Sequence, residues 1–136
     1  MAAYVYYYRN SFLILNTVRE HVITINTIDT MSYAQVDVGK PNSAGVRRKS
    51  TSTISFNYRA DFSDSLMYIY SRARSSVQAD IDRDSIVFDV YSARERNYIS
   101  SFLLAKKYNN ETIQDFRIVY PYIFLLLRNN LIIMKM

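Results

Sequence analysis

The chain has 136 residues, a net charge of +5 and a pI near 9.5, so we expect one basic domain that covers residues 1–136. It contains no cysteine, one histidine and two glycines, which excludes disulfides, thiolate metal sites, cysteine nucleophiles and glycine-rich phosphate loops. We therefore predict a protein that is not an enzyme and that needs no metal and no cofactor.

Four short segments before the first loop have the composition of β-strands. Residues 3–8, 12–15 and 21–28 are rich in aromatic and β-branched side chains, and residues 33–38 alternate between apolar and polar types. A loop is expected at residues 39–45, because both glycines and one of the two prolines fall there. The first third of the chain is thus predicted to consist of strands.

Three further strands are predicted in the middle of the chain. The clearest covers residues 50–59, because its side chains alternate between an apolar and a polar face. The apolar face consists of Ile54, Phe56 and Tyr58. Residues 66–74 fit either a strand or a helix that begins at Ser63, and we favour the strand. Residues 85–91 form another strand, with Ile86, Phe88 and Val90 pointing inward.

After residue 91 the apolar spacing changes from two residues to the spacing of a helix. Ser92 and Glu95 match a capping box at the start of a first helix. The pair Asn109-Asn110 fits the end of that helix. The pattern therefore predicts that the chain leaves the sheet at Ser92 and continues as a helix.

A second helical run covers residues 113–127 and is expected to kink at Pro121, because proline removes a backbone donor. Strands over residues 1–91 followed by helices over residues 92–130 predict an α+β fold. Its expected form is an antiparallel multi-strand sheet followed by two C-terminal helices, in an intertwined dimer.

The polar face of the strands at 50–59 and 66–74 is the first candidate site. Its hydroxyl, amide and guanidinium groups can bind phosphate and sugar, and its tyrosine rings can stack on unpaired bases. Three adjacent cations at 47–49 would reach phosphate from the preceding loop. A solvated sheet face without a ligand is the alternative. The predicted RNA-binding residues are Arg47, Arg48, Lys49, Thr51, Thr53, Ser55, Asn57, Arg59, Tyr68, Tyr70, Arg72 and Arg74.

The apolar C-terminal segments are the second candidate. Residues 118–127 are apolar throughout, but ten residues between Arg117 and Arg128 are too few to cross a membrane. This surface is expected either to lie between two subunits or to pack on the chain's own sheet. The predicted dimer-interface residues are Ile99, Phe102, Leu103, Phe116, Tyr120, Ile123, Phe124 and Leu127.

Three weaker patterns have simpler explanations. Asp80, Asp82 and Asp84 alternate as in a calcium loop, but the glycine and the final acid of such a loop are missing, so pairing with arginines is favoured. Residues 47–50 also fit the pattern of a basophilic kinase site, but such short patterns occur often by chance, and a solvated charge run is the favoured explanation over phosphorylation. The single histidine, His21, is expected to be structural.

The order of four segments carries a resemblance to a known family. They are the strands at 50–59 and 85–91, the switch at Ser92-Ala93-Arg94-Glu95-Arg96-Asn97-Tyr98-Ile99, and the second helix after Asn109-Asn110. This order resembles that of the coat proteins of single-stranded RNA bacteriophages. The resemblance implies a dimer whose helices clasp the partner's sheet, and a sheet face that binds genomic RNA.

We therefore expect a non-enzymatic viral coat-type protein that self-assembles and binds RNA on the polar face of its sheet. A small RNA-binding viral accessory or regulatory protein that forms no particles is the alternative. A third candidate is a peripheral membrane or partner-binding factor that uses residues 118–136 as its anchor. The expected partners are RNA and further copies of the chain, not a small molecule or a membrane. The expected location is the virion or host cytoplasm, because residues 1–10 lack the pattern of a secretion signal.

Overall fold

The computed structural model is an all-β structure. It describes residues 2–16, 20–28, 43, 57–71 and 84–136. These residues form twelve strands in four antiparallel sheets, and they include no helix. The predicted α+β class with two C-terminal helices is therefore wrong.

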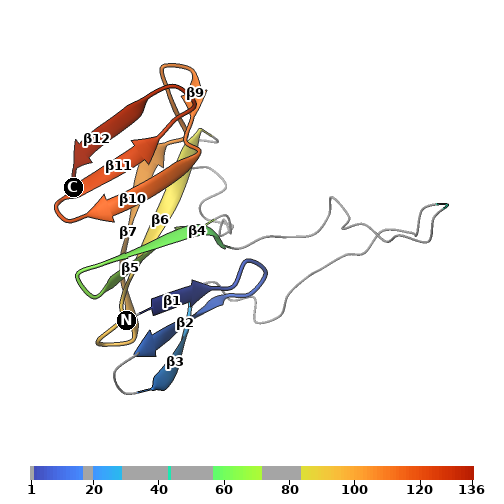
Figure 1. Cartoon of the computed structure of the whole chain (residues 1–136), viewed down its shortest axis with the longest axis vertical. Coiled ribbons are helices and arrows are strands. Elements are labelled where there is room, and N and C mark those ends of the chain that lie inside the picture. The colour runs from blue at the N-terminus through green and yellow to red at the C-terminus, as the bar shows by residue number, and fades with distance from the viewer. Residues whose placement is uncertain (1, 17–19, 29–42, 44–56, 72–83) are drawn as a thin grey trace.

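Three of the sheets form the body of the molecule (Figure 1). The N-terminal sheet has the order β1-β2-β3, with β1 at Ala2–Val5, β2 at Ser11–Asn16 and β3 at His21–Asn26. The central sheet has the order β4-β5-β6-β7, with β4 at Asn57–Ser63, β5 at Leu66–Ser71, β6 at Ser85–Ser92 and β7 at Asn97–Ala105. The C-terminal sheet has the order β10-β11-β12, with β10 at Asp115–Val119, β11 at Tyr122–Leu126 and β12 at Leu131–Lys135. A small hairpin pairs β8, Lys107–Tyr108, with β9, Glu111–Thr112.

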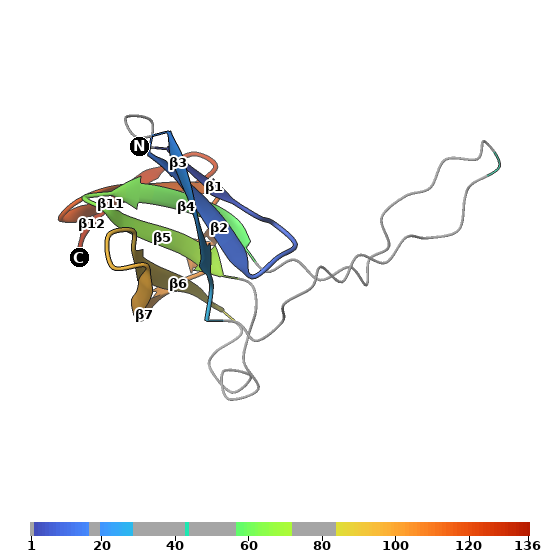
Figure 2. The same cartoon turned by 90° about the horizontal axis from the view of Figure 1, so that it is seen from below.

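The central sheet packs against a different sheet on each of its faces (Figures 1 and 2). On one face, a buried cluster joins it to the N-terminal sheet through Phe12, Ile14, Ile25, Met67, Ile69, Tyr91 and Ala93. On the other face, a second cluster joins it to the C-terminal sheet through Tyr68, Ile86, Phe88, Val90, Phe116, Ile118, Ile123 and Leu125. Alternate residues of β5 therefore enter opposite cores.

Most of the predicted strands are present, and some have shifted bounds. Strand β1 ends at Val5, earlier than the predicted segment 3–8, whereas β2 and β3 match their predictions closely. The preference for a strand after residue 66 is confirmed by β5. The strand at 85–91 is confirmed by β6, and Ile86, Phe88 and Val90 share one core as predicted.

Two predicted strands and the predicted loop at 39–45 lie largely or wholly outside the described residues. Residues 33–38 are among them, and of the strand at 50–59 only the last three residues are described, as the start of β4. Ile54 and Phe56 therefore have no described position, and Tyr58 is half-buried.

The first predicted helix is replaced by a turn and strand β7. The amide of Glu95 does donate to the Ser92 hydroxyl at 3.0 Å, as in a capping box, but this bond closes the turn between β6 and β7. A bulge follows, because Val90 pairs with Ser100 and Tyr91 pairs with Tyr98. The extra residue, Ile99, interrupts the two-residue alternation of β7 and makes its apolar spacing look helical.

The second predicted helix is replaced by a hairpin of two five-residue strands, β10 and β11. Pro121 lies in their turn, after a cis peptide bond. Asn109 and Asn110 form the turn between β8 and β9, with φ of 49° and 64°, values that asparagine tolerates better than most residues. The helical spacing of 113–127 arises because one turn separates two alternating strands.

Candidate nucleic-acid interface

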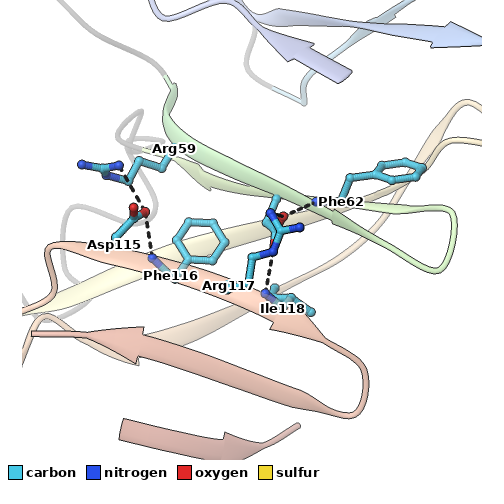
Figure 3. A network of polar contacts seen from close by, with 7 residues as sticks. Arg59, Phe62, Asp115, Phe116, Arg117 and Ile118 are labelled. Atoms are coloured by element: carbon cyan, nitrogen blue, oxygen red, sulfur yellow. Dashed lines mark hydrogen bonds and ion pairs between the residues drawn. The ribbon is translucent and has the colours of Figure 1, made fainter. Parts of the chain in front are cut away.

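Strand β4 lies at one edge of the central sheet and is fixed to β10 by a buried carboxylate (Figure 3). Asp61 Oδ2 accepts the amide N–H of Ile118 at 2.6 Å. Its Oδ1 accepts the amide of Phe62 at 2.9 Å and Nη1 of Arg117 at 2.8 Å. Both oxygens of this buried carboxylate are thus paired with donors, which is the condition for keeping a charge inside a protein.

A second ion pair joins the same two strands nearer the surface. Arg59 Nη1 lies 3.1 Å from Asp115 Oδ1, and the same oxygen accepts the amide of Phe116 at 2.9 Å (Figure 3). Both side chains are about half exposed, so we assign this pair less than about 1 kcal/mol of stability. Its main effect is to hold the Arg59 guanidinium at the surface between the two sheets.

The start of β4 is fixed to the N-terminal sheet by an amide. Asn57 is 2% exposed, and its Nδ2 donates to the carbonyl oxygens of Tyr6 and Arg9, each at 2.9 Å. These carbonyls belong to the connection between β1 and β2. The prediction that Asn57 faces an RNA ligand is therefore wrong for this structure, because its amide is used to dock the N-terminal sheet.

Two adjoining hollows follow β4. The first, of about 500 Å³, lies between β4 and β1 and is lined by Tyr4, Val5 and Tyr7 among others. The second, of about 520 Å³, lies between β4 and the C-terminal sheet, where Phe124 lines it. Arg59, Ala60, Asp61 and Arg117 line both hollows. The two hollows therefore adjoin, and we call the pair the β4 groove.

Tyrosines and arginines occupy the walls of the β4 groove. Tyr4 is 61% exposed and meets Tyr6 edge-to-face at 5.2 Å between ring centroids. Tyr7 contacts the ring of Tyr58 at 6.5 Å, and the Arg59 guanidinium carbon lies 5.2 Å from the centre of the Tyr58 ring. Such ring contacts limit the motion of the side chains, so the groove presents positioned aromatic and cationic groups.

Only Arg59, among the predicted RNA-binding residues that are described, is exposed at the groove. Tyr68 is buried against the C-terminal sheet, and burial, followed by the charge of Asp64, raises the pKa of its hydroxyl. Tyr70 is half-buried between the rings of Tyr58 and Phe88. These placements overturn an exposed tyrosine face on β5, because β5 lies between β4 and β6 and is covered by a sheet on each side. Eight predicted residues lie outside the described parts: Arg47, Arg48, Lys49, Thr51, Thr53, Ser55, Arg72 and Arg74.

The sequence interpretation did not assign the residues of the first hollow to a site. Residues 4–9, Tyr-Val-Tyr-Tyr-Tyr-Arg, were interpreted only as a strand and a turn. Their signal is visible in the composition, since five of these six residues are tyrosine or arginine. Arg117 gave no comparable signal, because nothing local indicates that it approaches β4.

The predicted dimer-interface residues divide between core and surface. Phe116, Ile123 and Leu127 are buried within the chain, and Phe102 is half-buried beside the second core cluster, so these four pack inside one subunit. The exposed or partly exposed remainder is Ile99, Leu103, Tyr120 and Phe124.

The acidic pattern at 80–84 and His21 form no recognisable site among the described residues. Asp84 is exposed, whereas Asp80 and Asp82 lie outside the described parts, and the described residues contain no cluster of three potential metal ligands. His21 is exposed at the start of β3. Where the structure is described, it contains no helix that is long and apolar enough to cross a membrane.

A second buried carboxylate lies in the central sheet, apart from the residues that line the β4 groove. Asp89 is 3% exposed and accepts a hydrogen bond from the Ser101 hydroxyl, which also contacts the Tyr98 hydroxyl at 2.8 Å. Burial raises the pKa of Asp89, and hydrogen bonds from Ser101 and Ser71 partly oppose that rise. The cluster is polar and compact, and none of Asp89, Ser101 and Tyr98 lines either hollow of the β4 groove.

Comparison with protein-family models, with curated proteins and with solved structures finds no match. The two helices on which the resemblance to phage coat proteins depended are strands in the described residues. The site must therefore be interpreted from its own geometry.

Proposed function

We propose that this is a non-enzymatic RNA-binding protein that holds unpaired bases in the β4 groove. The observation that carries the proposal is the presence of positioned tyrosine rings and partly exposed arginines along the two adjoining hollows of the β4 groove. Proteins that bind single strands combine aromatic side chains, on which bases stack, with cations that follow the backbone.

The arginines of the groove keep donors for phosphate. Arg59 and Arg117 each use Nη1 for their carboxylate partners, and their side chains are 40% and 73% exposed. A guanidinium has five N–H donors, so each arginine has donors beyond the one used in its ion pair. The carboxylates thus orient the guanidiniums, while the net charge of +5 attracts a polyanion to the protein as a whole.

Fluorescence anisotropy with a labelled ten-nucleotide oligouridine tests the proposal. We expect binding that weakens steeply with salt, because phosphate contacts release counterions. Tyr4→Ala should weaken binding by about 5- to 150-fold, the range expected when one base loses its stacking partner. Arg59→Gln should reduce the salt dependence by the equivalent of about one phosphate contact.

Tyr120 provides the matched control, because it is as exposed as Tyr4 but lies in the turn between β10 and β11 and does not line the groove. Tyr120→Ala should bind like the unmodified chain. Absence of binding at low salt, or equal losses in the two tyrosine variants, would contradict a site in the β4 groove.

A further inference from the structure

Strand β12 leaves one of its edges unpaired at the outside of the molecule (Figure 1). It pairs with β11 on one side, and no other described strand pairs with its second edge. Natural edge strands usually carry a charge, a proline or a bulge that prevents pairing with another chain. Strand β12, Leu-Ile-Ile-Met-Lys, has none of these before Lys135, and its register with β11 is regular.

The ladder with β11 determines which backbone groups of β12 point outward. The N–H of Leu127 donates to the carbonyl of Asn130 at 2.9 Å, and the N–H of Met136 donates to the carbonyl of Pro121 at 2.8 Å. Hydrogen-bonded pairs alternate with non-bonded pairs in an antiparallel ladder, so every second residue counted from Asn130 bonds to β11. The residues whose N–H and C=O groups point away from β11 are Leu131, Ile133 and Lys135.

These three residues are symmetrical about Ile133. A two-fold axis at Ile133 aligns that residue with Ile133 of a second copy and aligns Leu131 with Lys135 of the second copy, in antiparallel orientation. All three positions then become hydrogen-bonded pairs, and each pair exchanges two backbone bonds. A register moved by two residues would leave an outward-pointing residue of each copy without a partner.

The side chains beside this edge also favour a second copy. Leu131 and Ile133 are 58% and 57% exposed on the outer face of the C-terminal sheet. Self-pairing places Ile133 beside its own equivalent and places Leu131 beside the aliphatic stem of Lys135. The two Lys135 positions lie about 14 Å apart along the strands, which exceeds the screening length of about 8–10 Å at physiological salt.

We propose that β12 pairs with β12 of a second copy about a two-fold axis at Ile133, so that two three-stranded C-terminal sheets become one continuous sheet. A two-fold axis requires that the partner strand run antiparallel to β12. The exposed apolar side chains of Leu131 and Ile133 favour a partner strand that is as apolar as β12 itself. This homodimer differs from the helical interface that the sequence suggested, and it does not depend on RNA binding in the β4 groove.

Amide hydrogen exchange on the unmodified chain tests the pairing directly. Raising the protein concentration should slow exchange at Leu131, Ile133 and Lys135, while Ile132 and Met134, which already bond to β11, stay equally protected. Sedimentation should show a change from monomer to dimer over the same range. A monomer at all concentrations, or unchanged exchange at the three outward-pointing amides in a dimer, would overturn the proposal.

Two variants separate edge pairing from stacking of the apolar sheet faces. Ile133→Pro removes an N–H that β11 does not use, so the subunit should fold and the dimer should be lost. Val119→Lys places a charge on the exposed outer face of β10, away from both hollows of the β4 groove, and leaves the β12 edge intact, so the dimer should persist. If Ile133→Pro still formed the dimer and the lysine variant did not, the dimer would form by stacking of the apolar sheet faces, and edge pairing would be wrong. RNA binding measured on both variants keeps this outcome separate from the fate of the β4 groove.

Discussion

The N-terminal and C-terminal sheets have the same number of strands, yet β4 docks them with opposite chemistry. Toward the N-terminal sheet, β4 presents the amide donor of Asn57, and toward the C-terminal sheet it presents the carboxylate of Asp61. The backbone explains the difference. The β1–β2 connection offers carbonyl oxygens, which need a donor, whereas β10 offers the N–H of Ile118, which needs an acceptor.

The comparison shows that the polar residues of β4 match unpaired backbone groups on neighbouring sheets. A register shift between Asn57 and Arg59 places Asn57 on the face of β4 toward the N-terminal sheet, whereas Asp61 lies on the face toward the C-terminal sheet. Burial of these side chains is tolerated because each supplies the hydrogen bond that a neighbouring strand lacks. Exchanging donor for acceptor at either position should therefore uncouple one sheet and leave the other attached.

The largest effect is expected from Asp61→Ala. This change leaves the N–H of Ile118 without its acceptor and Arg117 without its partner, so the free energy of unfolding should fall by about 3 kcal/mol. Urea denaturation measures the loss. Hydrogen exchange should rise first in β10 and much less in the N-terminal sheet.

Arg117→Gln is the control for the charge of the pair. Arg117 is largely exposed, so its loss should cost less than about 1 kcal/mol. If the two variants were equally destabilised, the ion pair would be the main link between β4 and β10, and our assignment of that role to the backbone N–H of Ile118 would be wrong.

A smaller effect is expected from Asn57→Ala, about 1–2 kcal/mol by urea denaturation, because two carbonyl oxygens lose their donor. The loss is limited because Asn57 Oδ1 is itself buried without a donor among the described residues, so alanine also removes an unsatisfied acceptor. Asn57→Asp should cost more than alanine, since it places a carboxylate against the two carbonyls. Equal stability of the two variants would show that the amide does not dock the N-terminal sheet.

The sequence predicted strands well where side chains alternate without interruption. Strands β5 and β6 were found because Met67 and Ile69, or Ile86 and Phe88, recur at every second position. Their two-sided burial was not predicted, since a residue such as Tyr68 looks exposed until a second sheet is known to cover it. Alternation indicates a strand, but it does not show how many sheets cover that strand.

The helices were predicted wrongly because short strands and turns can imitate helical spacing. The bulge at Ile99 shifts the alternation of β7 by one residue, and the turn at Pro121 joins two apolar strands into one long apolar run. The candidate site was incompletely predicted for a related reason, because its residues come from segments that are distant in the sequence. Arg59 was selected from its own segment, but its neighbours Tyr4 and Arg117 reach the groove through tertiary contacts that no local pattern reports.

The smallest effect, and the one with opposite sign, is expected from Asp89→Asn. Burial raises the pKa of Asp89, so the folded state binds its proton more tightly than the unfolded state does. The stability that this group contributes is therefore complete below its ordinary pKa of 3.8 and is lost as pH rises through the higher folded-state pKa. The variant removes a carboxyl whose charged form is disfavoured by burial, so its free energy of unfolding at neutral pH should be slightly higher than that of the unmodified chain.

The pH dependence distinguishes this effect from a simple change in packing. The advantage of Asp89→Asn should shrink as pH falls toward 4 (about the pKa of a free aspartate), measured by urea denaturation at several pH values. Glu111→Gln provides a comparison of opposite sign, because hydrogen bonds from Asn129 and Asn130 lower the pKa of that partly exposed carboxyl. The stability that the Glu111 carboxylate contributes to the unmodified chain should be present at neutral pH and should be lost as the pH falls through its lowered folded-state pKa. An advantage of Asp89→Asn that is equal at all pH values would mean that its hydrogen bonds, not its charge, determine the stability of this part of β6.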